Sequence, residues 1–101
     1  MEKSKFIDDL INKAKQISVE ITEKEANMFY EYDKLLLDWN EKINLTAITN
    51  EREIILKHFI DSLTINRYIE NADNVMDIGT GAGFPGVPLK IVNENKRFIL
   101  V

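Results

Sequence analysis

All four glycines of this 101-residue chain lie within eight positions, in the stretch VMDIGTGAGFPG at residues 75–86. Glycine allows positive φ and lets another group approach the backbone without meeting a Cβ, and a helix N-terminus offers unpaired N–H groups. The glycines follow a short apolar run at residues 75–78 and precede a segment with helical composition. We therefore predict a buried parallel strand over residues 75–78, a ligand-binding turn, and a helix from Val87 to about Asn93.

The residues before this turn have the pattern of three helices. Apolar residues spaced one, three and four apart predict an amphipathic helix over residues 4–17. Thr22 and Glu25 form a capping box that predicts the start of a second helix, and Asn50 with Glu53 predicts the start of a third. The expected core-facing residues are Phe6, Ile7, Leu10, Ile11, Ala14 and Ile17, then Phe29, Tyr32, Leu36, Trp39 and Ile43, then Ile54, Ile55, Phe59, Ile60, Leu63 and Ile65.

A second strand is predicted over residues 97–101, so the fold class is α/β: N-terminal helices precede the first β-loop-α-β unit of a Rossmann-like sheet. We divide the chain into an N-terminal helical segment, 1–72, and the start of a Rossmann-like domain, 73–101. Two parallel strands with one crossover helix cannot cover both faces of their own sheet. We therefore expect the chain to be a fragment of a longer protein.

Charge and composition exclude several classes of protein. The chain has 17 acidic and 13 basic residues and no cysteine, so we expect neither a disulfide framework nor a thiolate metal site. No secretory or membrane-spanning pattern is present, and we expect a cytoplasmic protein without membrane contact. Because neither half is basic, nucleic-acid contact would need local patches or further parts of the protein.

The glycine-rich turn allows two interpretations. Gly81 to Gly86 matches the dinucleotide pattern G-x-G-x-x-G, but it begins late relative to the strand end, and Pro85 and Pro88 lack the N–H that a phosphate needs. The alternative unit is Asp77 followed by G-x-G-x-G. The aspartate gives negative potential near an ammonium or sulfonium group, and the glycines leave room for an adenosyl-methionine moiety. We favour the second interpretation.

The segment DIGTGAGFPGVPL (77–89) resembles the cofactor motif of class I S-adenosylmethionine-dependent methyltransferases, most closely that of the RsmG family, also called GidB. DWNEKINLTAIT (38–49) and KHFIDSL (57–63) are similar to the N-terminal segment of that family, and the resemblance spans roughly residues 26–101. It implies that the full-length protein uses S-adenosyl-L-methionine to methylate N7 of a guanine in the 530 loop of 16S ribosomal RNA. The implied partner is 16S ribosomal RNA or the small-subunit assembly.

Taken residue by residue, the resemblance implies that Gly79 and Phe84 contact the methyl donor and that Gly81 and Gly83 shape the same loop. Asp77 matches the strand-end acid. The ribose-binding acid of the family would follow Val101, so the fragment alone is expected to be inactive. We expect the full-length protein to be a monomer, whereas the exposed strand edge could let the fragment self-associate.

No catalytic base is predicted, because guanine N7, the implied target, carries a lone pair and no proton. No metal site is predicted either, because the chain has one histidine, no cysteine and no carboxylate cluster at ligand spacing. His58 and Asp61 lie at i and i+3, and we expect a structural hydrogen-bonded pair near the glycine loop rather than a general-base dyad. Trp39 is expected in the core; the alternative is that Trp39, Asn40 and Asn44 stack on and hydrogen-bond an RNA base.

Two other functions stay open at this point. One is a non-enzymatic helical interaction module with an incomplete nucleotide-binding fold, suggested by the charged helix faces and the short sheet. The other is a nicotinamide-dependent oxidoreductase, which the prolines and the glycine register disfavour.

Overall fold

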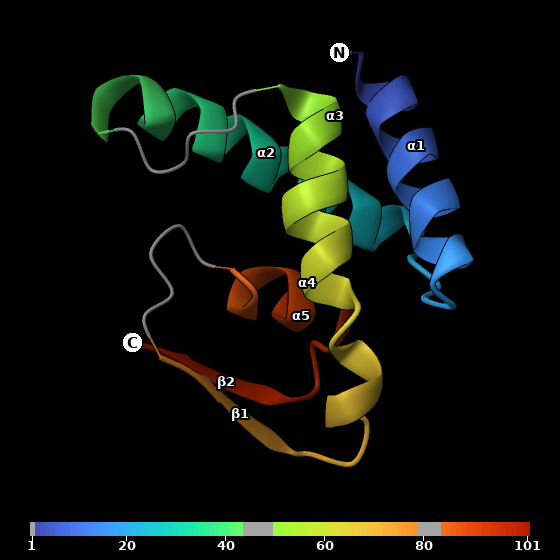
Figure 1. Ribbon diagram of the computed structural model, residues 1–101, viewed down its shortest axis with the longest axis vertical. Coiled ribbons are helices and arrows are strands. Elements are labelled where there is room, and N and C mark those ends of the chain that lie inside the picture. Colours follow the sequence, from blue (N-terminus) through green and yellow to red (C-terminus); the bar gives the residue numbers. More distant parts are fainter. Residues whose placement is uncertain (1, 44–49, 79–83) are drawn as a thin grey trace.

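A computed structural model describes residues 2–43, 50–78 and 84–101 (Figure 1). The described chain is rich in helix and has one small sheet of two parallel strands. In Figure 1 the sheet lies at one end, α5 (Gly86–Val92) lies between the sheet and the longer helices, and the N-terminus is at the far end. The elements are α1 (Lys3–Gln16), α2 (Glu23–Ile43), α3 (Glu51–Glu53), η1 (Ile54–Ile60), α4 (Asp61–Leu63), η2 (Asn66–Ile69), β1 (Asn74–Asp77), α5 (Gly86–Val92) and β2 (Arg97–Leu100).

Local hydrogen bonds explain where the helices begin and end. The predicted capping box is confirmed: the Glu25 N–H donates to Thr22 Oγ1 over 3.1 Å, and the Thr22 N–H donates to Glu25 Oε1 over 2.9 Å. The Arg52 N–H donates to Asn50 Oδ1 over 3.0 Å, which confirms the second cap. At the end of α1, Ser18 has a φ of 61°, and its N–H donates to the Lys15 carbonyl as in a Schellman motif.

The third helical run is not a uniform α-helix. Its central seven residues, η1, form a π-helix that joins α3 to α4. The Ser62 hydroxyl donates to the His58 carbonyl over 2.5 Å just after the π segment. π-turns are often found at functional sites, and here the π-helix carries the first part of the KHFIDSL motif, Lys57 to Ile60, whereas α4 carries the rest.

The sheet is a parallel βαβ unit, as the sequence predicts. Asn74 pairs with Arg97, and the register continues to Asp77 opposite Leu100. The crossover helix α5 packs on β2 and also on α2 and α4. The side chain of Lys96 donates to the Glu70 carbonyl over 2.9 Å, which ties the turn before β2 to the segment before β1. A complete Rossmann-like sheet stays a prediction.

One core joins the helices to α5. Phe59, on η1, is fully buried, and its ring centroid lies 5.1 Å from Phe29, 5.6 Å from Tyr32 and 6.3 Å from Phe6. Leu89 and Ile91 of α5 and the helical residues belong to one buried cluster. The domain division at residue 72 stays a prediction, and both parts share this core.

Several expectations about burial were wrong. Trp39 is 47% exposed and Ile65 is 39% exposed, so neither belongs to the buried core. Met76 is 59% exposed, so β1 is not buried on both sides: α5 covers one face, and Met76 and Ile99 lie on the other. The side chains of Asn40 and Ile43, and Asn44 as a whole, lie outside the description.

Candidate functional site

The strand-end acid and the fourth glycine hold the two ends of the glycine-rich turn together. The N–H of Gly86, the first residue of α5, donates to Asp77 Oδ2 over 2.8 Å. A Cβ on Gly86 would lie 2.9 Å from the same oxygen and 3.0 Å from Leu100 Cγ. The elements β1, β2 and α5 meet at Gly86 and leave no room for a Cβ, so this position requires glycine. The hydrogen bond also sets the distance between Asp77 and Gly86, which lie at the two ends of the turn.

This contact bears on which ligand the turn accepts. A dinucleotide pyrophosphate would need free N–H groups at the start of α5. The Gly86 N–H is bonded to Asp77, Pro85 is the N-cap residue and Pro88 lies in the first turn. A carboxylate at this position repels a phosphate and attracts a cation. The geometry therefore favours a cationic ligand over a dinucleotide.

The helix predicted from Val87 begins one residue earlier, at Gly86, and Pro88 is its third residue. Proline is tolerated there, because the third N–H of a helix lacks an intrahelical partner.

Phe84 follows the glycine-rich turn and packs on the helical part of the molecule. Its ring stacks on the His58 imidazole, with centroids 4.4 Å apart and planes at 10°. The Phe84 ring centroid also lies 5.7 Å from that of Tyr32 and 6.0 Å from that of Phe59. Phe84 thus fixes the end of the turn against α2 and η1.

His58 is the only histidine of the chain and connects η1 to the turn through this stack. Burial lowers the pKa of His58 below its ordinary value, and the negative charge of Asp61 partly opposes that shift. Asp61 therefore acts on His58 through its charge. We had expected a hydrogen-bonded pair of His58 and Asp61 to connect the helices to the glycine loop, and the stack of His58 on Phe84 makes that connection instead.

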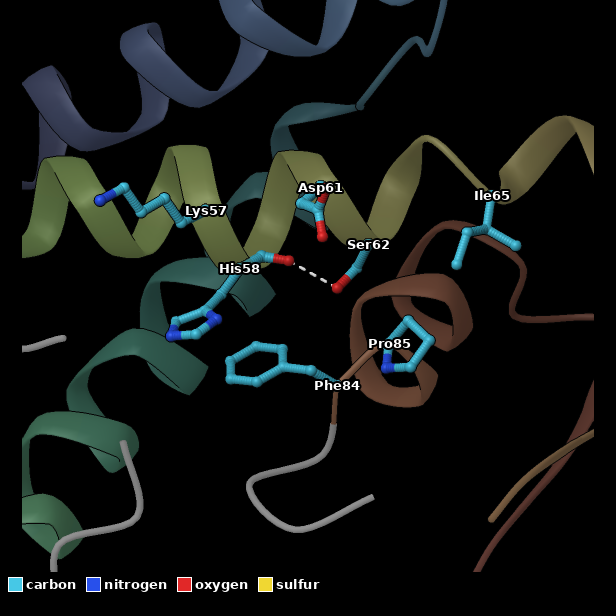
Figure 2. Close-up of a pocket in the computed structure, with 7 residues that line it drawn as sticks. All are labelled: Lys57, His58, Asp61, Ser62, Ile65, Phe84 and Pro85. Carbon is cyan, nitrogen blue, oxygen red and sulfur yellow. Dashed lines mark hydrogen bonds between the residues drawn. The ribbon is translucent and has the colours of Figure 1, made fainter. Parts of the chain in front are cut away.

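A pocket of 240 Å³ lies between the η1–α4 helix and the residues just after the turn. Figure 2 shows Asp61 and Ser62 on the helix side and Phe84 and Pro85 on the opposite side. The described residues that line it are Lys57, His58, Asp61, Ser62, Ile65, Phe84 and Pro85. It combines a carboxylate, an ammonium group and apolar rings next to the predicted cofactor loop.

Of the five predicted cofactor-binding residues, Asp77 and Phe84 lie at the two ends of the turn, where the structure describes them. Gly79, Gly81 and Gly83 lie outside the described residues. The cofactor contacts of all five stay predictions. Within the described ranges, no group of three or more His, Asp or Glu side chains could hold a metal ion, and no helix is long and apolar enough to cross a membrane.

Sequence reasoning missed two residues of this site. Gly86 was quoted in the motif without a role, although a glycine directly before a helix is a signal for close packing. Tyr32 was expected only as a core residue; its ring lies beside Phe84, and burial raises the pKa of its phenol.

Comparisons with known proteins identify the family of this chain. The sequence profile of the family described as rRNA small subunit methyltransferase G (GidB) matches residues 23–101. The chain is 45% identical over 104 residues to the ribosomal RNA small subunit methyltransferase G of Clostridium novyi (strain NT), which covers 100% of this chain and 43% of that protein. It is 49% identical over 90 residues to the protein of the same name from Pelotomaculum thermopropionicum, covering 87% of this chain and 38% of the relative.

A third relative of the same name, from Caldanaerobacter subterraneus subsp. tengcongensis, is 47% identical over 92 residues, or 89% of this chain and 38% of the relative. The chain thus spans between 38% and 43% of the length of these relatives. The profile match extends from the start of α2 through the turn to the end of β2. The chain belongs to the rRNA small subunit methyltransferase G family.

Proposed function

We propose that this chain, within a protein as long as its relatives, is part of an S-adenosylmethionine-dependent methyltransferase that acts on N7 of a guanine in the 530 loop of 16S ribosomal RNA. The guanine and the position of methylation come from the resemblance of the motifs described above. The proposal places the protein in the cytoplasm, where ribosomal subunits are assembled.

The observation that supports the proposal most directly is the contact between Asp77 and Gly86. It fixes a glycine-rich turn at the carboxyl end of a parallel strand, which is where open α/β sheets bind their ligands. The carboxylate gives this edge the negative potential that a sulfonium or ammonium group requires. The family match over residues 23–101 supports the same assignment.

The proposed reaction needs little acid–base chemistry from the protein. S-adenosylmethionine supplies an electrophilic methyl group when it is bound. Guanine N7 has a lone pair and no proton, so no residue has to remove a proton before transfer. This chain would contribute binding and alignment, effects that together can lower a barrier by about 7–11 kcal/mol. Asp77 and the glycines would orient the donor, and Phe84 would hold the turn in place.

The first experiment measures donor binding by the full-length protein. Isothermal titration calorimetry with S-adenosylmethionine should give a saturable signal for the wild type, and Gly79→Asp should abolish it. Gly81→Val should also abolish binding while far-UV circular dichroism retains the helical signal. No signal from the wild type, or stronger binding of NAD in competition, contradicts the proposal.

The second experiment tests the target. Small subunits that lack the modification are incubated with the full-length protein and the donor, and the 16S ribosomal RNA is then digested. Nucleoside mass spectrometry should detect 7-methylguanosine, and mapping should place it in the 530 loop. Methylation of another base or another position would limit the function to an rRNA methyltransferase of different specificity.

The oligomeric state is tested by sedimentation velocity. The full-length protein should sediment as a monomer, whereas this chain alone should show the expected self-association.

A further inference from the structure

Apart from Phe84, the described lining of the pocket between η1–α4 and the end of the glycine-rich turn has no assigned role in the predicted cofactor site. Its wall of Phe84 and Pro85 directly follows the predicted cofactor loop. A base that receives a methyl group has to lie in contact with the donor, so a pocket at this position is suited to the target rather than to a distant ligand.

The size and the lining of the pocket suit one heterocycle. Its volume of 240 Å³ is below the range of about 300–1,000 Å³ that drug-sized ligands occupy. Phe84, Pro85 and Ile65 offer apolar surface for the planar faces of a base, whereas Asp61 and Ser62 offer oxygen atoms for its edge (Figure 2). Splayed bases of RNA are commonly held in this way, by stacking and by hydrogen bonds to one edge.

The chemistry of Asp61 then selects which base fits. Among the described residues no hydrogen bond or ion pair reaches its carboxylate, which is exposed at the pocket wall. A carboxylate only accepts hydrogen bonds. The Watson–Crick edge of guanine presents two adjacent donors, N1–H and N2–H, whereas adenine presents an acceptor at N1. A guanine held by this edge leaves N7, on its other edge, free to face the methyl donor.

We infer that this pocket holds the target guanine, with the Asp61 carboxylate accepting hydrogen bonds from N1–H and N2–H. Asp61 acts as a specificity-determining residue and takes no part in bond making. Lys57, which is exposed and lines the pocket, offers an ammonium group to a backbone phosphate of the RNA. The inference rests on the proposed function and adds to it the edge by which the base is recognised.

The test uses the full-length protein and a short RNA that contains the methylated guanine, with either guanosine or inosine at that position. Inosine lacks only the N2 amino group. The variants are Asp61→Asn and, as a matched control, Glu53→Gln, an exposed carboxylate on α3 that does not line the pocket. The measurements are kcat/KM for methyl transfer and the Kd of S-adenosylmethionine.

Asp61→Asn should lower kcat/KM at least about tenfold with guanosine, because a hydrogen bond to a charged group is lost, and should leave the Kd of the donor within about twofold. Inosine should also lower the rate of the wild type, because it removes the hydrogen bond from N2–H to the carboxylate. It should lower the rate of Asp61→Asn by a smaller factor, since that variant has already lost the charged acceptor of this hydrogen bond. Glu53→Gln should behave as the wild type with both RNAs.

Three outcomes would overturn the inference. An unchanged kcat/KM in Asp61→Asn would show that the carboxylate does not bind the target base. Equal effects of inosine on the wild type and on Asp61→Asn would show that the N2 amino group binds elsewhere. Weaker binding of the donor by Asp61→Asn would assign the pocket to the cofactor. The inosine comparison in the wild type needs no variant, so poor folding of Asp61→Asn does not prevent the test. A wild type that neither binds the donor nor methylates RNA contradicts the proposed function itself, which separates that failure from failure of the pocket alone.

Discussion

Replacing Gly86 by alanine tests whether close packing or loop flexibility requires this glycine. Gly86 is the first residue of α5, and a glycine whose conformation suits alanine is normally stabilised by the change, by about 0.4–1 kcal/mol. The structure predicts the opposite sign. The new Cβ would lie 2.9 Å from Asp77 Oδ2 and 3.0 Å from Leu100 Cγ, closer than carbon atoms normally approach.

The magnitude follows from what has to move. Overpacking costs about 1–3 kcal/mol, and relief by rotation of Asp77 would break its hydrogen bond to the Gly86 N–H, which is worth about 1.5 kcal/mol or less at this half-buried site. After the gain from the lower entropy of the unfolded chain is subtracted, Gly86→Ala should lower the free energy of unfolding by about 1–2 kcal/mol.

Urea unfolding of the wild type, Gly86→Ala, Asp77→Ala and the double variant measures this effect. Asp77→Ala removes the oxygen that the Cβ meets, so Gly86→Ala should cost about 1 kcal/mol less in that background. Asp77→Asn keeps the bulk of the side chain and should keep most of the cost. The reasoning is refuted if Gly86→Ala is as stable as the wild type or more stable, or if its cost is the same with and without the Asp77 side chain.

Three further predictions concern single residues. Ser18→Gly should raise the free energy of unfolding by about 0.5–1 kcal/mol in urea, because Ser18 has a φ of 61° that glycine adopts without strain. Thr22→Ala should lower it by about 1 kcal/mol and Thr22→Ser by much less, since serine keeps the capping oxygen; equal costs would contradict the capping box. NMR titration of the single histidine should give a pKa below the ordinary 6.5, and Asp61→Asn should lower that pKa further. The unfolded state then binds more protons than the folded state, so the free energy of unfolding should fall as the pH decreases below 6.5. A raised pKa of His58 would refute the burial argument.

The parts of the fold that depend on local sequence were predicted well. Thr22 and Asn50 cap helices with atoms only a few positions away, so the capping pattern alone locates the starts of those helices. The parallel pairing of β1 with β2 follows from a strand, a crossover helix and a second strand. Trp39 shows the limit: periodicity gives the face of a helix on which a residue lies, but not whether another element covers that face.

The candidate site was predicted in part for the same reason. Asp77 and the glycines stand together in the sequence, so their proximity could be read from it. The stack of Phe84 on His58 joins residues that lie far apart in the chain, and its partner depends on how η1 is wound. Neither the π-helix nor the pocket beside it leaves a signal in hydrophobic spacing, because a π-turn still presents Ile55, Phe59 and Leu63 to the core.

The shared core predicts that the helical segment 1–72 will not fold as well alone as it does with the βαβ unit. Leu89 and Ile91 belong to the same buried cluster as Phe59 and Leu63, and the Phe84 ring covers part of Phe59. Removing residues 73–101 would therefore expose apolar side chains that α5 now buries, at about 25 cal/mol for each Å² exposed.

We expect the segment 1–72 to unfold at a lower urea concentration than the chain of 101 residues and to bind a hydrophobic dye that the longer chain does not bind. An equally stable segment without dye binding would show that the helices form an independent domain, and the interaction-module alternative would then gain support. With a shared core, the helices and the glycine-rich turn have to be treated as one binding unit, because the same aromatic residues that stabilise the helices also fix the position of Phe84.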